Sequence, residues 1–202
     1  MRTTLYLVRH GKTDWNDQGR LQGAKDIPLN KAGLSEAKAA GITLKSVPVH
    51  AIYSSPLSRA HETAREIAKH HDLDITIVDA LKETAFGIFE GITWNELLVH
   101  PLIKNGPKEH ERFTATIGGA ESIYETYVRA STAVDKIVSK HPNETVILVS
   151  HGLLMKTIAY HMGVVEKEDI EKLMVRNAYP YKVEYIHDKK KYVPTDFPIE
   201  WH

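Results

Sequence analysis

The sequence predicts an α/β fold with a mostly parallel central sheet and helices on both faces. Four short apolar segments rich in β-favouring residues, at 3–9, 50–54, 75–78 and 145–150, alternate with longer segments that have helical periodicity. This alternation is typical of parallel sheets, because a crossover between parallel strands usually contains a helix. The first and last of these strands are each followed by a His-Gly pair.

The remaining elements carry their own boundary signals. Apolar and small residues recur at helical spacing over 34–44, behind Asn30, which is a favourable N-cap residue. A capping-box pattern at 122–125 begins a long amphipathic segment. Near the C-terminus, strand-like segments at 182–186 and 192–193 flank a lysine-rich turn.

Length and composition indicate one globular domain over residues 1–202, since 42% apolar and 26% charged residues are ordinary for such a domain. Lys plus Arg and Asp plus Glu both total 26, so no general field favours nucleic acid or a membrane surface as a partner. Cysteine is absent, which excludes disulfides and thiol catalysis and fits a reducing compartment. Because no long apolar run or signal-peptide pattern is evident, we expect a cytoplasmic protein.

The first strand ends in Arg9, His10 and Gly11. An apolar strand that stops at polar residues delivers their side chains to the edge of a sheet, where ligands bind in open α/β folds. We interpret His10 as a nucleophile, because Gly11 allows a sharp turn and close backbone approach to a ligand, and Arg9 places a cation beside the imidazole. A lone histidine is more often structural, so this hypothesis requires partners at other strand ends.

Two further strand ends supply such partners. Ser55 and Pro56 follow the second strand and predict a helix start with Ser55 as the N-cap. Arg59 then lies in the first turns of that helix, where a cation is unfavourable unless an anion binds there. The fourth strand ends in His151 and Gly152 before an apolar helix. The polar residues at these three strand ends together predict a site for a phosphate group.

The segment 81–91 is apolar and punctuated by glycine without a regular period, so we predict a packed loop. A carboxylate enclosed by such a loop suits a general acid at neutral pH, and both Glu83 and Glu90 are candidates that the residues alone do not separate. The composition around 85–118 predicts an insertion or lid. The histidines show no metal-ligand spacing supported by a second cluster, so no metal is predicted.

Five motifs follow one another along the chain: Leu-Val-Arg-His-Gly-x-Thr-x-Trp-Asn at 7–16, Ser-Ser-Pro-x-x-Arg-Ala-x-x-Thr-Ala at 54–64, Leu-x-Glu-x-x-x-Gly around Glu83, Gly-Ala-Glu-Ser at 119–122, and Ser-His-Gly at 150–152. In combination they resemble the histidine phosphatase superfamily, in its phosphoglycerate mutase-like branch. The resemblance implies a phosphoglycerate mutase-like fold with an edge strand from the C-terminal region. Two residues depart from the pattern: Lys12 replaces an acidic residue, and Phe89 replaces a frequent tryptophan.

The resemblance also implies roles for individual residues. His10 would attack phosphorus in line and become phosphohistidine, while Arg9, Arg59 and His151 would hold the equatorial oxygens. Glu83 rather than Glu90 would protonate the leaving oxygen and later deprotonate the attacking water. Cationic side chains would take the place of a metal. The rest of the phosphate cradle would come from Asn16, Gln22, Gly23 and Gly152.

We predict a phosphatase for small phosphorylated metabolites rather than the alternative, a cofactor-dependent phosphoglycerate mutase, because only a short segment separates Gly91 from Gly118 where family mutases carry a longer insertion. No cofactor is expected; 2,3-bisphosphoglycerate would be a phosphoryl primer only in the mutase. A serine hydrolase is disfavoured, since Leu148 stands where a nucleophile elbow at Ser150 needs glycine. A non-catalytic phospholigand-binding module would not need His10 and Glu83. The oligomeric state stays open, a homodimer being one option.

Overall fold

Six strands form one sheet in the computed structural model, which describes residues 1–108, 111 and 113–201. Their order across the sheet is β3-β2-β4-β1-β5-β6. The first four strands in the chain run parallel, which confirms the prediction of a mostly parallel sheet, and β5 and β6 from the C-terminal region are added antiparallel at one edge. The strands are β1 (Arg2–Arg9), β2 (Ala51–Ser54), β3 (Ile75–Ile77), β4 (Thr145–Ser150), β5 (Pro180–Ile186) and β6 (Lys191–Asp196).

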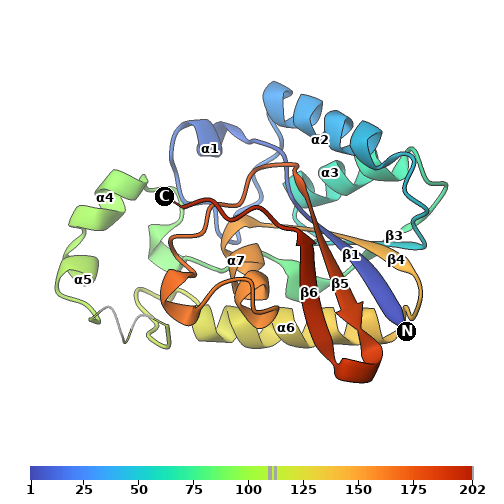
Figure 1. The fold of residues 1–202 in the computed structure, drawn as a ribbon. Helices are drawn as coiled ribbons and strands as arrows, with labels where there is room; N and C mark the ends of the chain where they lie inside the picture. Colours follow the sequence, from blue (N-terminus) through green and yellow to red (C-terminus); the bar gives the residue numbers. More distant parts are fainter. Residues whose placement is uncertain (109–110, 112, 202) are drawn as a thin grey trace.

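Alternate residues of the central strands face two different hydrophobic cores. Leu5 and Leu7 of β1 belong to one core together with α6 and α7, whereas Val8 belongs to the other with α2 and α3. Figure 1 shows these two helix pairs on opposite sides of the sheet, which confirms the predicted α/β architecture with helices on both faces. The four helices are α2 (Lys31–Leu44), α3 (Ser58–Ala68), α6 (Ile123–Ser139) and α7 (Gly152–His161).

Two of the helix starts are those predicted, and one is not. Asn30 caps α2, and Ser122 begins the capping box of α6. The prediction that Ser55 caps the third helix is wrong, because α3 begins at Ser58. The backbone N–H of Ser58 donates to Asp26 Oδ1 at 2.7 Å, so a distant loop supplies the cap, while the Ser55 hydroxyl contacts a side chain from another strand end.

Irregular segments and short helices lie beyond the carboxyl ends of the parallel strands (Figure 1). The predicted loop at 81–91 contains only 3₁₀ turns, and residues 109, 110 and 112 of the predicted lid lie outside the described residues, as does residue 202. Among the described residues, no helix combines the length and apolar character that crossing a membrane requires. The short elements are α1 (Asp14–Asp17), η1 (Asp79–Leu81), η2 (Gly87–Phe89), α4 (Trp94–Val99), α5 (Pro101–Lys104), η4 (Lys167–Asp169) and η5 (His187–Lys189).

Candidate active site

The strand ends singled out in the sequence meet at one edge of the sheet. The register of β1 and β4 pairs Arg9 with Ser150, so the residues that follow, His10 and His151, lie side by side. Their ring centroids are 5.2 Å apart. Ser55, which follows β2, reaches the same place, and its Oγ lies 2.7 Å from Nε2 of His151. Three parallel strands therefore deliver polar side chains to one buried cluster.

His10 is held as a neutral imidazole with one free lone pair. Its Nδ1 lies 2.7 Å from the carbonyl oxygen of Gly11, and because a carbonyl only accepts, Nδ1 carries the proton and Nε2 carries the lone pair. The side chain is almost fully buried. Burial, together with the charges of Arg59 and Arg9, holds the pKa of His10 well below its usual value. The neutral ring therefore keeps a free lone pair at Nε2.

His151 is also neutral and contacts Ser55. The Ser55 hydroxyl accepts from the backbone N–H of Leu57 at 3.3 Å and lies 2.7 Å from Nε2 of His151, to which it donates in the tautomer that carries the imidazole proton on Nδ1. Burial and the neighbouring charges of Arg59, His10 and Arg9 keep the pKa of His151 well below its usual value. Nδ1 of His151 is buried and has no hydrogen-bond partner among the described residues, so in that tautomer it can donate to a ligand.

Two guanidinium groups, of Arg59 and Arg9, act on this pair of imidazoles. Arg59 is fully buried, and its Nη atoms donate to the carbonyl oxygens of Lys25 and Gly23 at 2.8 and 2.9 Å. Arg9 donates from Nη1 to the carbonyl oxygen of Val175 at 2.8 Å. Burial lowers the pKa of Arg59 to about 10, which leaves it charged at neutral pH. Among the described residues, no carboxylate oxygen lies within 4.0 Å of either guanidinium, so both charges lack a paired anion.

Unpaired buried polar atoms are concentrated at this site. Nε of Arg9, Nε of Arg59, Nδ1 of His151 and Oε1 of Gln22 all lack a hydrogen-bond partner among the described residues. The two Nε atoms are donors, as is Nδ1 of His151 in the tautomer given above, and rotation of the Gln22 amide would present its NH₂ group in place of the oxygen. Buried polar groups are nearly always paired in folded proteins, so this cluster indicates the place of an anionic ligand.

Gly11 and Gly23 lie close to neighbouring chain segments, and Gly152 lies beside Arg9. A Cβ on Gly11 would lie 2.3 Å from the Gly33 carbonyl oxygen, so the close approach at Gly11 is to the start of α2. Gly23 has a φ of +55°, and a Cβ there would lie 2.2 Å from Oε1 of Glu90. Gly152 opens α7, and a Cβ there would lie 3.4 Å from the guanidinium of Arg9. Asn16 uses its Oδ1 to cap α1 and, within the described part of the chain, makes no side-chain hydrogen bond to the imidazoles or guanidiniums.

The structure places the two candidate glutamates differently. The carboxylate of Glu83 accepts hydrogen bonds from the backbone N–H groups of Thr84, Leu153 and Leu154 at 3.0–3.2 Å, which sets it at the N-terminus of α7. Its surroundings are therefore N–H donors rather than the apolar loop expected. Glu90 accepts from backbone N–H groups of loop residues and joins two loops. Glu83 contributes attractive charge to both Arg9 and Arg59, which indicates that it lies beside the anion site.

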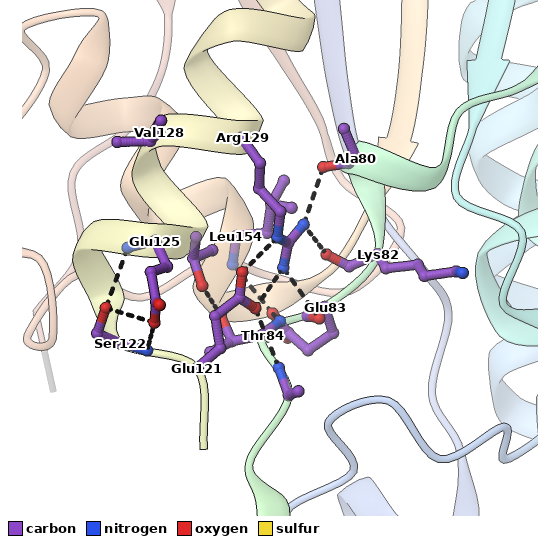
Figure 2. A network of polar contacts seen from close by, with 12 residues as sticks. Ala80, Lys82, Glu83, Thr84, Glu121, Ser122, Glu125, Val128, Arg129 and Leu154 are labelled. Atoms are coloured by element: carbon purple, nitrogen blue, oxygen red, sulfur yellow. Dashed lines mark hydrogen bonds and ion pairs between the residues drawn. The ribbon is translucent and has the colours of Figure 1, made fainter. Parts of the chain in front are cut away.

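A polar network that the sequence did not reveal holds the loop of Glu83 (Figure 2). Arg129 on α6 donates to the carbonyl oxygens of Ala80, Lys82 and Glu83 at 2.7–3.1 Å. The same guanidinium forms a bidentate ion pair with Glu121 at 2.6 and 2.8 Å. Only the fold brings these residues together. Arg129 therefore fixes the backbone at Glu83.

We predict that stability falls as the pH is lowered through 6.5, because unfolded histidine has a higher pKa than buried His10 and His151. Below pH 6.5 the unfolded chain binds more protons, and each histidine contributes a slope of up to about 1.4 kcal/mol per pH unit to the free energy of unfolding. Urea unfolding at pH 7, 6 and 5 measures this slope. His10→Asn should make the dependence of the free energy of unfolding on pH shallower. An unchanged slope in that variant would contradict the lowered pKa of His10.

Comparison with known proteins agrees with the geometry of the site. The sequence profile of the histidine phosphatase superfamily (branch 1) matches residues 5–195. The chain is 37% identical over 168 residues to the metal-independent phosphoserine phosphatase of Arabidopsis thaliana, covering 77% of this chain and 67% of that one. It is 32% identical over 159 residues to phosphoserine phosphatase 1 of Hydrogenobacter thermophilus, covering 76% and 73% of the two chains.

The fold agrees with the same family. A phosphoserine phosphatase of Entamoeba histolytica, solved with phosphoserine, superposes with a TM-score of 0.85 at 30% identity and covers 96% of each chain. Among the described residues, no group of three or more His, Asp and Glu side chains is placed to hold a metal ion. Because the family profile spans nearly the whole chain and its catalytic motifs meet in one buried cluster, the chain belongs to branch 1 of the histidine phosphatase superfamily and is a phosphomonoesterase.

Proposed function

We propose that this enzyme hydrolyses small phosphorylated metabolites through a phosphohistidine formed on His10, without a metal or an organic cofactor. The main support is the buried cluster of unpaired polar atoms around the imidazole of His10, with two guanidinium charges that have no paired carboxylate in the described part of the chain. A phosphate dianion supplies both the charge and the acceptors that this cluster lacks. We also propose that the enzyme acts in the cytoplasm, which the absence of cysteine supports.

In the first step, the lone pair of His10 Nε2 attacks phosphorus and the bond from phosphorus to the leaving oxygen breaks. Arg9, Arg59 and Nδ1 of His151 donate to the equatorial oxygens, where charge is held in the transition state. Glu83, in its carboxylic acid form, gives its proton to the leaving oxygen. The products are an alcohol, phosphohistidine and the Glu83 carboxylate.

In the second step, water attacks the phosphorus of phosphohistidine and the N–P bond breaks. The Glu83 carboxylate takes a proton from that water, so it returns to its acid form, and inorganic phosphate leaves. His10 regains its lone pair at Nε2. The hydrogen bond from Nδ1 to the Gly11 carbonyl stabilises the positive charge that the ring bears during the phosphorylated state.

The proposal is tested by assaying phosphate release from a panel of phosphomonoesters in the presence of a chelator. We expect turnover without added metal. The assay should include 3-phosphoglycerate with a trace of 2,3-bisphosphoglycerate, on which a mutase would isomerise much faster than it releases phosphate. That outcome would overturn the phosphatase assignment, as would a strict requirement for a divalent metal.

Arg129 is predicted to be a positioning residue for Glu83, since it anchors the backbone of residues 80–83. Arg129→Met should lower kcat for alkyl phosphates about 10- to 100-fold, because a misplaced acid protonates a poor leaving group slowly. Loss of these partly buried charge-assisted bonds should also lower the free energy of unfolding by about 2 kcal/mol. Aryl phosphates with acidic leaving groups should lose much less in a single-turnover measurement.

The control is Arg65→Met, which removes an exposed arginine on α3 that pairs only with Glu62 in the described structure. It should leave kcat unchanged for every leaving group. An equal loss for alkyl and aryl phosphates in Arg129→Met would show a purely structural role and contradict the positioning of Glu83.

A further inference from the structure

A cavity of about 490 Å³ adjoins the anion site and shares Arg9, Glu83 and Gly152 with it. Sites for drug-sized molecules span roughly 300–1,000 Å³, so this cavity has room for an organic group much larger than a three-carbon acid. Its other walls come from the loop after Glu83, from α4 and α5, and from the first turns of α7. The group attached to the phosphate would therefore lie against these segments.

The chemistry of the cavity wall is mainly apolar. The described lining residues include no serine, threonine, asparagine, glutamine, tyrosine or histidine side chain. The polar side chains of the lining are charged, namely Arg9, Lys156 and the carboxylates of Glu83, Glu121 and Glu171. Aromatic and aliphatic side chains form much of the wall, among them Phe86, Phe89, Trp94, Leu97, Leu98 and Ile103.

Two of these side chains are exposed as well as lining the cavity. Trp94 and Leu98 on α4 keep 54% and 65% of their surface accessible. Large apolar side chains at the rim of a cavity favour a ligand that covers apolar surface. Val99 lies next to Leu98 on the same helix and is 61% exposed, but it does not line the cavity. Substitutions at Leu98 and at Val99 therefore separate an effect on the cavity from a general effect on α4.

Lys156 is a second cation of the cavity wall, besides Arg9. Lys156 lies four residues after Gly152 on α7, so both face the cavity from one side of the helix, about 6 Å apart along its axis. Its Nζ donates to the backbone carbonyl of Glu171 at 2.9 Å, and no carboxylate oxygen among the described residues lies within 4.0 Å of it. Burial lowers the pKa of Lys156 to about 8, so the ammonium remains mostly charged at neutral pH.

We infer that the preferred substrate is a phosphomonoester of a bulky apolar group, aromatic or branched, that also carries a carboxylate, and that Lys156 binds this carboxylate. The inference rests on the proposed function. The apolar body would contact the side chains of α4 and the loop after Glu83, while the phosphate and the carboxylate would each meet a cation, Arg9 and Lys156. Lys156 is thereby assigned as a specificity-determining residue.

Lys156 is tested with 4-carboxyphenyl phosphate and phenyl phosphate. In Lys156→Met, the ratio of kcat/KM for the carboxylated substrate to that for phenyl phosphate should fall about tenfold from the wild-type ratio, mainly through KM. Lys38→Met removes an exposed lysine from α2 and should keep the wild-type ratio. An unchanged ratio in Lys156→Met would overturn the assignment of this residue.

The apolar wall is tested with phenyl phosphate and ethyl phosphate. In Leu98→Asp, the ratio of kcat/KM for phenyl to ethyl phosphate should fall about tenfold, whereas Val99→Asp should keep the wild-type ratio. Equal ratios in the two variants would overturn the proposal that this cavity binds the organic group of the substrate. If wild-type enzyme hydrolyses neither substrate, the proposed function itself fails; if it hydrolyses both without any selectivity, only the inference about substrate class fails.

Discussion

His10→Asn should lower kcat on every phosphomonoester by at least about 10⁴-fold, because the variant lacks the lone pair at Nε2 that attacks phosphorus. Asparagine is chosen because its amide NH₂ can still donate to the Gly11 carbonyl that holds Nδ1 of His10. The fold should therefore be kept. Steady-state phosphate release measures the loss, and circular dichroism checks the fold.

The exposed His70 provides the matched control for this substitution. His70→Asn should retain the wild-type kcat, since this residue lies outside the candidate site. A folded His10→Asn enzyme that keeps more than a small fraction of wild-type turnover would show that phosphorus is attacked by another group, and the buried cluster would then be a binding site without this nucleophile.

Glu83→Gln is expected to separate the two chemical steps. With alkyl phosphates, kcat should fall about 10²- to 10⁴-fold, because a poor leaving group needs the proton of Glu83. With 4-nitrophenyl phosphate, the leaving group departs without that proton, but phosphohistidine then lacks the base that activates water. Rapid mixing should therefore show a burst of about one nitrophenolate per enzyme, followed by slow turnover.

Glu90→Gln is the matched control, since Glu90 is the other glutamate of the loop and its carboxylate binds backbone N–H groups of Ala24 and Phe86. Glu90→Gln should show no burst, and any change in its kcat should be the same for good and poor leaving groups. A burst in Glu90→Gln and not in Glu83→Gln would exchange the two roles and contradict the placement of Glu83 at the start of α7.

The sheet could be predicted because its strands have strong local signals. The buried run at 145–150 is apolar on both faces, and the structure places alternate residues of β4 in two separate cores. The positions of His10 and His151 follow from the same signal, since each comes directly after a buried strand. Parallel register then brings these two imidazoles together without further information from the sequence.

Features that depend on tertiary contacts could not be predicted. The start of α3 moves to Ser58 because Asp26 caps it from another loop, and no local pattern records that contact. Arg129 lies 46 residues from Glu83 in the chain, and only the packing of α6 against the loop reveals their hydrogen bond. The cavity wall has the same origin, since it is built from irregular segments whose path is set by packing.

The central claim is that the phosphoryl group of the substrate becomes covalently bound to His10 before it is released as phosphate. The direct measurement is to mix enzyme with ³²P-labelled substrate, quench with base within milliseconds, and map the label by mass spectrometry. We predict a phosphoryl group on His10 that is stable in alkali, is released by acid, and accumulates to about one per enzyme in Glu83→Gln with a good leaving group. Label on His151 or a serine, or an unlabelled protein during a burst, would contradict this account.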